Sequence, residues 1–155
     1  MKAARIICIG KMKSAYWKEA CAAYGRLLRP LRPVEVVELK DGGPQLAPEM
    51  RKSQEAGRLL AALAACDLPV ALDQSGRQWT SPAFAQFLRD CDERLLKRPA
   101  FIIGGPYGLA PEVVAACRER LSLSAMTWPH ELARVLLFEQ LYRAESILRG
   151  YPYHH

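Results

Sequence analysis

The chain has 155 residues, of which half are apolar and a quarter charged. This size and balance predict one globular domain, residues 1–155, with a core that needs no disulfide staples. No apolar run approaches the roughly 20 residues that span a bilayer, and the apolar part of residues 1–10 is shorter than the core of a signal peptide, so no membrane partner is expected. The net charge is +6, and residues 1–40 account for all of it, with nine basic and three acidic side chains.

The first half of the chain alternates strand and helix patterns. In chain order we expect a strand at 5–9, a helix at 14–28, a strand at 34–39, a helix at 48–65 and a strand at 70–72. Ser14 is the expected N-cap of the first helix, and Pro48 suits the first turn of the second. The segment Asp41-Gly-Gly-Pro44 predicts a loop before that second helix.

The second half continues this alternation. We expect a turn at 74–77, a helix at 81–96, a strand at 100–103, a helix at 111–120, a strand at 121–126 and a long helix at 130–149. Five strands that alternate with helices predict an α/β fold with a mainly parallel sheet and helices on both of its faces.

Two of the expected strands run directly into loops of small or rigid residues, at 101–108 and at 121–130. Glycine just past a buried strand lets a ligand come close to the backbone, and open α/β sheets bind ligands at the carboxyl ends of their strands. The glycine pattern is GGxxG after the fourth strand, and the chain has neither GxGxxG nor GxxxxGK[ST]. We therefore expect an adenosine-type ligand held by backbone amides rather than a dinucleotide or a nucleoside triphosphate.

The basic excess of the first 40 residues has two interpretations. Its members are Lys2, Arg5, Lys11, Lys13, Lys18, Arg26, Arg29, Arg32 and Lys40. They form either a solvated surface that keeps the protein soluble or the electrostatic footprint of a polyanion, for which RNA and DNA are the obvious candidates.

The cysteines and histidines predict neither a disulfide framework nor a metal site. The cysteines are Cys8, Cys21, Cys66, Cys91 and Cys117, an odd number without a CxxC pair. Because most of them lie among apolar residues, we expect buried, reduced thiols in a cytoplasmic protein. No spacing of histidine, cysteine and carboxylate matches a metal site, so no metal is expected.

The last expected helix carries more apolar surface than one core-facing stripe requires. Its apolar residues are Leu132, Val135, Leu136, Leu137, Phe138, Leu141, Tyr142, Ile147 and Leu148. Such a helix is either buried within one domain or covered by a second subunit, and we favour a two-fold homodimer.

Short motifs follow one another along the whole chain. The first are Gly10-Lys-x-Lys13, Tyr16-Trp17, Leu72-Asp73-x-x-Gly76 and Ile103-Gly104-Gly105-x-x-Gly108-Leu109. The closing ones are Leu123-Ser124-Ala-Met-Thr127-x-Pro129-His130, Arg134-Val135, Glu139-Gln140-x-Tyr142-Arg143-Ala144 and Tyr151-Pro-Tyr153-His154. This ordered set resembles the SPOUT-class RNA methyltransferases, and among them the bacterial large-subunit methyltransferase H family.

The resemblance implies a C-terminal trefoil knot, a homodimer, S-adenosylmethionine as methyl donor, and the N3 atom of a pseudouridine in 23S rRNA, within the ribosome, as acceptor. It places the cofactor contacts on Leu72, Gly104, Gly105, Leu123, Ser124, Ala125, Met126, Thr127 and Trp128. A branched side chain at Gly105 is accordingly expected to fill the pocket.

Methylation of an imide nitrogen requires removal of its proton, and His130 could accept that proton near neutral pH. The alternative for His130 is a structural residue at the start of the last helix. The resemblance implies that Tyr153 and His154 reach the pocket of the partner subunit, whereas a frayed terminus is the usual state of such residues.

Two arginines of the last helix are further candidates. Arg134 and Arg143 could hold an RNA phosphate or polarise the oxygens of the acceptor base. The alternative is that they pair along the helix with Glu131 or Glu139. Glu139 is expected to orient an arginine rather than act as a base.

Two other classes of function stay open. One is a ribosome-binding protein that kept the fold and lost catalysis, which the intact GGPYG loop and PYH tail disfavour. The other is an α/β nucleotide-binding enzyme such as a reductase, which the missing phosphate loop disfavours. Binding of S-adenosylmethionine, or tight binding of NAD or FMN, distinguishes them.

Overall fold

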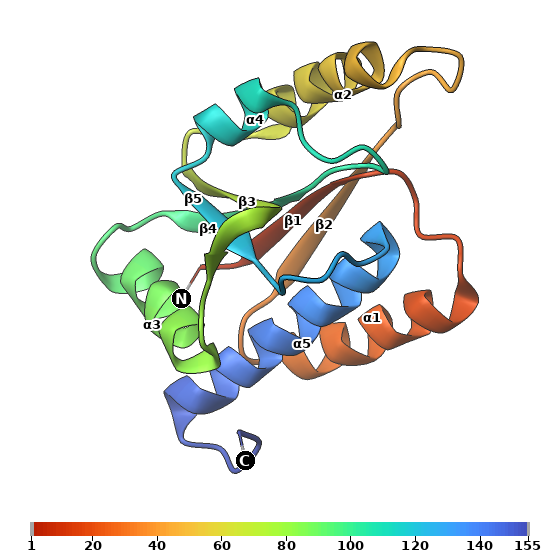
Figure 1. The fold of residues 1–155 in the computed structure, drawn as a ribbon. Coiled ribbons are helices and arrows are strands. Elements are labelled where there is room, and N and C mark those ends of the chain that lie inside the picture. The colour runs from red at the N-terminus through yellow and green to blue at the C-terminus, as the bar shows by residue number, and fades with distance from the viewer. Residues whose placement is uncertain (1, 155) are drawn as a thin grey trace.

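The computed structural model describes residues 2–154; Met1 and His155 lie outside the described residues. Strands and helices alternate along the chain (Figure 1). The elements are β1 (Ala4–Ile9), α1 (Ala15–Leu28), β2 (Val34–Leu39), α2 (Pro48–Ala62), β3 (Asp67–Gln78), α3 (Ser81–Glu93), β4 (Arg98–Ile103), α4 (Pro111–Ala116), β5 (Glu119–Ser122) and α5 (His130–Arg149).

The five strands form one sheet in the order β2-β1-β4-β3-β5, and all of its pairings are parallel. The carboxyl ends of the strands therefore meet at one edge, where the loops after β1, β3, β4 and β5 gather. The parallel α/β sheet predicted from the sequence is confirmed, while the knot stays a prediction.

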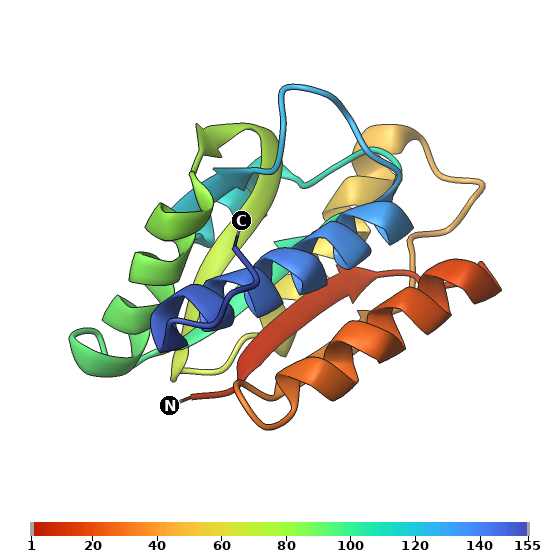
Figure 2. The same cartoon turned by 90° about the horizontal axis from the view of Figure 1, so that it is seen from below.

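Helices cover both faces of the sheet. On one face α5 packs between α1 and α3 (Figure 2), over a core that includes Phe101, Leu137 and Leu141. On the other face α2 and α4 pack over Ile7 and Ile102. The alternating apolar residues of β1 and β4 supply both cores, because successive side chains of a strand point to opposite faces. Within residues 2–154, no helix is both long and apolar enough to cross a bilayer.

Several boundaries differ from the sequence-based expectation. The segment 74–77 is not a turn; β3 continues through it, and Arg77 and Gln78 pair with Leu121 and Ser122 of β5 after a register shift. Pairing with β3 also draws Glu119 out of the expected helix, so α4 ends at residue 116 and β5 begins at 119 instead of 121. Tertiary strand pairing thus overrides the local turn and helix signals.

The remaining helix differences lie at the ends. Ser14 occupies the N-cap position of α1, but its side chain makes no capping hydrogen bond. Its N–H instead donates to the Glu131 carboxylate at 3.0 Å. Both α2 and α3 end about three residues earlier than expected, and the start and end of α5 are as predicted.

The cysteines are free but not all buried. Cys8 and Cys91 are buried, Cys21 and Cys117 are half-buried, and Cys66 is exposed. Burial raises the pKa of the Cys8 and Cys91 thiols to about 12, so both stay protonated. The expectation of buried thiols is wrong for Cys66, which lies in the connection between α2 and β3.

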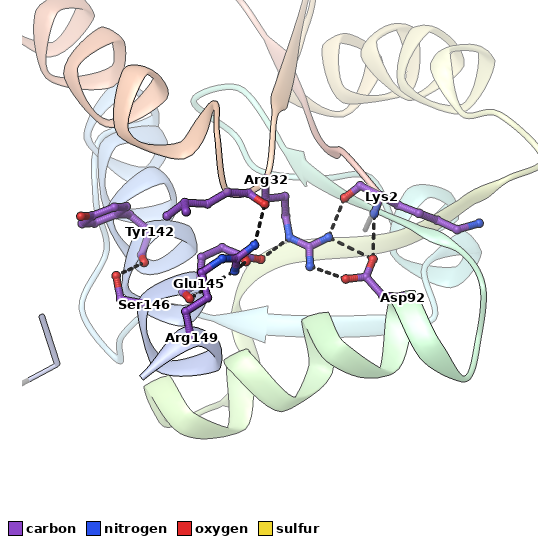
Figure 3. A network of polar contacts seen from close by, with 8 residues as sticks. Lys2, Arg32, Asp92, Tyr142, Glu145, Ser146 and Arg149 are labelled. Atoms are coloured by element: carbon purple, nitrogen blue, oxygen red, sulfur yellow. Dashed lines mark hydrogen bonds and ion pairs between the residues drawn. The ribbon is translucent and has the colours of Figure 1, made fainter. Parts of the chain in front are cut away.

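Two basic residues of the first 40 do not belong to a surface footprint. Arg5 is buried and pairs with Asp67 at 2.7 Å. Arg32 is fully buried, pairs with Glu145 of α5, and donates to Asp92 of α3 at 2.7 Å (Figure 3). These two guanidinium groups join elements inside the fold, so part of the basic excess serves the architecture.

Candidate active site

A cavity of about 350 Å³ opens at the carboxyl ends of β4 and β5, beside residues 72–74 in the middle of β3. Its walls come mainly from the loops that follow these strands and from the start of α5. The lining residues are Leu72, Asp73, Gln74, Ile103, Gly104, Gly105, Pro106, Gly108, Leu121, Leu123, Ser124, Met126, Thr127, Trp128, Pro129, His130 and Ala133. The volume lies at the lower end of the range for small-molecule sites.

The loop after β4 turns sharply because it begins with glycine. A Cβ atom on Gly104 would lie 2.6 Å from the backbone oxygen of Gly108, which no side chain tolerates. The N–H of Gly108 donates to the Gly105 carbonyl at 3.0 Å, and Gly108 itself has a φ of 79°. This close approach of backbone to backbone presents main-chain atoms, not side chains, to the cavity.

Gly105 lines the cavity, but a side chain there would not project into it. A Cβ atom on Gly105 would lie 3.0 Å from Oε1 of Glu55 and 3.3 Å from Cγ2 of Ile9. The expectation that a branched residue at Gly105 fills the pocket directly is therefore corrected: it would press on the buried Glu55 carboxylate behind the loop. Gly104 is the position at which a side chain necessarily reshapes the loop.

The loop after β5 is held by short polar contacts. The Ser122 hydroxyl donates to the Ser124 carbonyl at 2.8 Å, and the Ser124 hydroxyl accepts the N–H of Met126 at 2.9 Å. The Ala125 carbonyl accepts a hydrogen bond from the Gln74 amide at 2.8 Å. Of the cofactor residues predicted from the sequence, only Ala125 does not line the cavity, and this carbonyl ties the loop to β3.

Asp73 and Gln74 were not among the predicted site residues, although both line the cavity. Burial would raise the pKa of the Asp73 carboxyl, but hydrogen bonds from Arg120 and Ser75 outweigh it, so the pKa lies below its usual value. Asp73 thus stays ionised beside the cavity, and Arg120 balances its charge at a distance of 2.7 Å. The signal that could have found it is an acidic residue directly after the apolar run 70–72.

His130 is the first residue of α5 and lies in the wall of the cavity. Burial lowers the pKa of its imidazole, and the positive charge of Arg134 one turn later lowers it further. The ring is therefore neutral at physiological pH, with one nitrogen free to accept a proton.

Arg134 lies inside the protein and not in the cavity. Its guanidinium pairs with Glu38 of β2 at 2.7 Å and donates to the backbone carbonyl of Gly10 at 2.5 Å. The side chain is only 3% exposed. Arg134 consequently connects α5 to the end of β1. Its ion-pair partner is Glu38, and not Glu131 or Glu139, the two partners considered from the sequence.

The C-terminal tail follows the end of α5 that is remote from the first turn of this helix (Figure 1). Arg143 pairs with Glu139 at 2.7 Å and lies 4.9 Å from the centre of the Tyr153 ring. The Tyr153 hydroxyl donates to Glu139 at 3.2 Å, so this residue is packed rather than frayed, whereas His154 is exposed. Thirteen residues of helix place Arg143 about 20 Å from His130 along α5, and the described chain does not bring the predicted catalytic residues together.

The comparison with protein families decides the class. Residues 1–154 match the model of a family described as "Predicted SPOUT methyltransferase". The chain belongs to the SPOUT methyltransferase family.

Curated relatives of this SPOUT methyltransferase agree along its full length. A protein named ribosomal RNA large subunit methyltransferase H, from Oleidesulfovibrio alaskensis, is 50% identical over 155 residues, which is all of both chains. A protein of the same name from Nitratidesulfovibrio vulgaris (strain Miyazaki F) is 44% identical, again over all of both chains. The family predicted from the motifs is confirmed.

Solved structures support the SPOUT fold at much lower sequence identity. A crystal structure described as a probable methyltransferase from Bordetella pertussis Tohama I matches with a TM-score of 0.59. The match is 17% identical in sequence and covers 92% of this chain and 96% of that one. At this identity the likeness concerns the fold alone. Among the residues that the structure describes, this SPOUT chain has no group of three or more histidine, cysteine or acidic side chains able to hold a metal ion.

Proposed function

We propose that this protein transfers the methyl group of S-adenosylmethionine to the N3 atom of pseudouridine 1915 in 23S rRNA. Family membership and the name shared by its curated relatives support this activity. The single structural observation that carries it is the cavity backed by Gly104, at the carboxyl ends of β4 and β5 and beside the middle of β3. With rRNA as substrate, the proposed location of the protein is the cytoplasm, with the ribosome.

The cavity fits an adenosine-type ligand without phosphates. Leu72, Ile103 and Leu123 supply apolar walls for a flat base, while the loop begun by Gly104 offers backbone amides and carbonyls. Asp73, which is paired with Arg120 at 2.7 Å, adds carboxylate oxygens that can accept hydrogen bonds from ribose hydroxyls. These features support S-adenosylmethionine over NAD or FMN.

S-adenosylmethionine, when bound, supplies an electrophilic methyl group on a sulfonium sulfur. The chain then has to align the acceptor nitrogen and remove its proton. We assign His130 the role of general base. Its neutral imidazole lies in the wall of the cavity and can accept the proton of the N3 imide as the new N–C bond forms and the bond between the methyl carbon and sulfur breaks. The first turn of α5 thus places the proposed catalytic group in the wall of the cavity.

We further propose that the functional unit is a homodimer in which each tail serves the partner's cavity. Arg143 and Tyr153 lie at the far end of α5 from their own cavity, about 20 Å away. A two-fold axis that sets two copies of α5 antiparallel would bring the tail of one subunit to the cavity of the other. Two apolar side chains beside the cavity, Met126 and Trp128, are 71% and 40% exposed and suit coverage by a second subunit.

The proposed activity is tested by transfer of labelled methyl from S-adenosylmethionine to ribosomes purified from a strain that lacks this modification. We expect N3-methylpseudouridine in the 23S rRNA after nucleoside analysis. Binding of the cofactor without any transfer to ribosomes would contradict the assigned substrate. Failure to bind the cofactor would instead support the non-catalytic ribosome partner.

The role of His130 predicts a specific pH profile. The pKa of His130 lies below its ordinary value of about 6.5. Most His130 side chains are therefore neutral, and able to act as a base, from alkaline pH down to about pH 6.5. We expect the rate of methyl transfer at saturating substrate to stay level from pH 8 to about 6.5 and to fall at lower pH as the imidazole becomes protonated.

In the variant His130→Gln, which keeps a polar side chain but cannot titrate, this acidic limb should disappear and the rate at pH 7.5 should fall about 100-fold. Calorimetric affinity for S-adenosylmethionine serves as the control and should change little. An acidic limb that survives in the variant would assign the proton to another group.

A further inference from the structure

A second cavity, of about 710 Å³, opens beside the first at the carboxyl ends of β1 and β2. Pro106 and His130 line both cavities, so the two spaces share one wall. Three lysines line only the second space: Lys11 and Lys13 follow β1, and Lys40 follows β2. We call this space the lysine cavity.

The acidic residues of the lysine cavity are already engaged by the protein. Glu38 pairs with Arg134 at 2.7 Å. Glu131 accepts the backbone N–H groups of Lys13 and Ser14 at 2.6 and 3.0 Å.

Asp41 pairs with Arg51, which also lines this space, at 3.4 Å. Each acidic side chain of the cavity therefore has a partner other than a lysine ammonium group.

The three ammonium groups, by contrast, have no fixed partner. In the described part of the chain, none of Lys11, Lys13 and Lys40 makes a side-chain hydrogen bond or an ion pair. All three side chains are exposed. The charge of Lys13 helps to lower the pKa of the His130 imidazole, after the larger effects of burial and Arg134, which lower it, and of Glu131, which raises it. The cavity thus presents three unpaired positive charges next to the wall that holds the proposed base.

The loop that carries two of these lysines is rigidly held. Glu131 fixes the N–H groups of Lys13 and Ser14, Glu38 accepts the N–H of Met12 at 2.8 Å, and Arg134 donates to the Gly10 carbonyl at 2.5 Å. The start of α5, which bears His130, is tied to this loop by the same contacts. A ligand bound by the lysines would therefore be held at a fixed distance from His130, with little ordering of the backbone on binding.

We propose that the lysine cavity binds a backbone phosphate of the rRNA beside the acceptor nucleotide. This inference rests on the proposed function, and it adds the place where the RNA strand enters. Lysine is a point charge that suits phosphate without demanding a fixed orientation. With the acceptor base at the shared wall near His130, the flanking phosphate of the same strand lies over Lys11, Lys13 and Lys40, while the neighbouring cavity holds the methyl donor.

The test compares two triple variants that each remove three positive charges. The first is Lys11→Ala/Lys13→Ala/Lys40→Ala. The matched control is Arg29→Ala/Arg89→Ala/Arg94→Ala, which alters exposed arginines at the C-cap of α1, on α3 and at the C-cap of α3. Arg29 and Arg94 follow the carboxyl ends of their helices and lie at the amino-terminal edge of the sheet, away from both cavities.

The measurements are methyl transfer to purified ribosomes as a function of ribosome concentration and of salt, together with calorimetric affinity for S-adenosylmethionine. For the lysine variant we expect the KM for ribosomes to rise about 10-fold or more at 0.15 M salt, and the slope of log affinity against log salt to fall by about 2 to 3. Its cofactor affinity and its rate at saturating ribosomes should stay near those of the wild type.

The outcomes separate this inference from the proposed function. If the wild type methylates ribosomes and both triple variants raise the KM equally, the effect is one of net charge and the lysine cavity is not the RNA site. If the lysine variant loses its affinity for S-adenosylmethionine, the lysine cavity binds the methyl donor instead of the RNA. If the wild type itself transfers no methyl group to ribosomes, the proposed function fails first.

Discussion

Replacement of Arg32 by methionine is expected to lower the free energy of unfolding by about 3 to 5 kcal/mol. In a chain of this length the midpoint of thermal unfolding should fall by about 10 °C or more. The guanidinium of Arg32 is fully buried, and Glu145, with which it pairs, is equally buried. Removal of the cation leaves a carboxylate in the interior with a weaker partner, which costs far more than the loss of one surface ion pair.

The cost is large because Arg32 joins four parts of the chain (Figure 3). It pairs with Glu145 of α5, donates to Asp92 of α3 at 2.7 Å, and donates to the Lys2 carbonyl ahead of β1 at 2.6 Å. Arg32 itself lies just before β2. One side chain thereby closes the amino-terminal edge of the sheet against two helices, and methionine can replace its volume but none of its hydrogen bonds.

The stability difference between wild type and variant should also depend on pH. Burial would raise the pKa of Asp92, but the hydrogen bond from Arg32 outweighs it and the folded pKa lies below the unfolded value of about 3.9. A lowered folded pKa stabilises the protein above the unfolded pKa, and this contribution is lost as the pH falls through the folded pKa. The gap between Arg32→Met and the wild type should therefore narrow below about pH 4.

Urea unfolding of both proteins between pH 3 and 8 measures these effects. The control is Arg89→Met, which makes the same substitution at an exposed position of α3 and should change stability by no more than about 0.5 kcal/mol. Arg32 is remote from both cavities, so cofactor affinity should persist where the variant is folded. A loss as small as that of the control would mean that water replaces the network at little cost.

The contrast between α5 and β3 shows which structural signals are local. Pro129 and Gly150 bracket α5, and Gly150 closes the helix with a φ of 69°, so both ends could be read from the chain. The segment from Asp73 to Gly76 has the composition of a turn, yet it is an irregularity within β3, because Leu72 before it and Arg77 after it both pair with Leu121 of β5. That pairing joins residues more than 40 positions apart, and no local pattern encodes it.

The same distinction between local and long-range signals holds for the functional residues. The loop at Gly104 could be predicted because a close approach of two backbone segments demands glycine there. The link between Arg32 and Glu145, 113 positions apart, has no sequence signature, so the sequence alone does not separate Arg32 from the other basic residues of the first 40. The catalytic roles of His130, Arg143, Tyr153 and His154 stay predictions, since three of these residues lie at the end of α5 opposite His130.

Two inactive variants are expected to restore activity to each other when they share a dimer. Gly104→Ala should abolish cofactor binding, because its Cβ would meet the Gly108 carbonyl oxygen at 2.6 Å and the loop must change shape. Deletion of residues 153–155 should spare cofactor binding and abolish transfer. A mixed dimer then holds one complete site, formed by the cavity of the truncated subunit and the tail of the Gly104→Ala subunit.

Co-expression at equal amounts should recover about a quarter of the wild-type rate, because half of randomly paired two-fold dimers are mixed and each has one working site of two. The control pairs Gly104→Ala with His130→Gln, whose lesions both lie at the cavity, and should recover little. Thermal melting of each variant checks that the chains fold, and differently tagged subunits report that mixed dimers form. A fully active truncation would make the tail dispensable, whereas mixed dimers without recovery would place each tail in its own subunit's site. Recovery in the pair of the truncated chain with Gly104→Ala, and not in the control pair, requires a tail to cross between subunits. No rearrangement within one chain can combine an intact cavity with a tail that the same chain lacks.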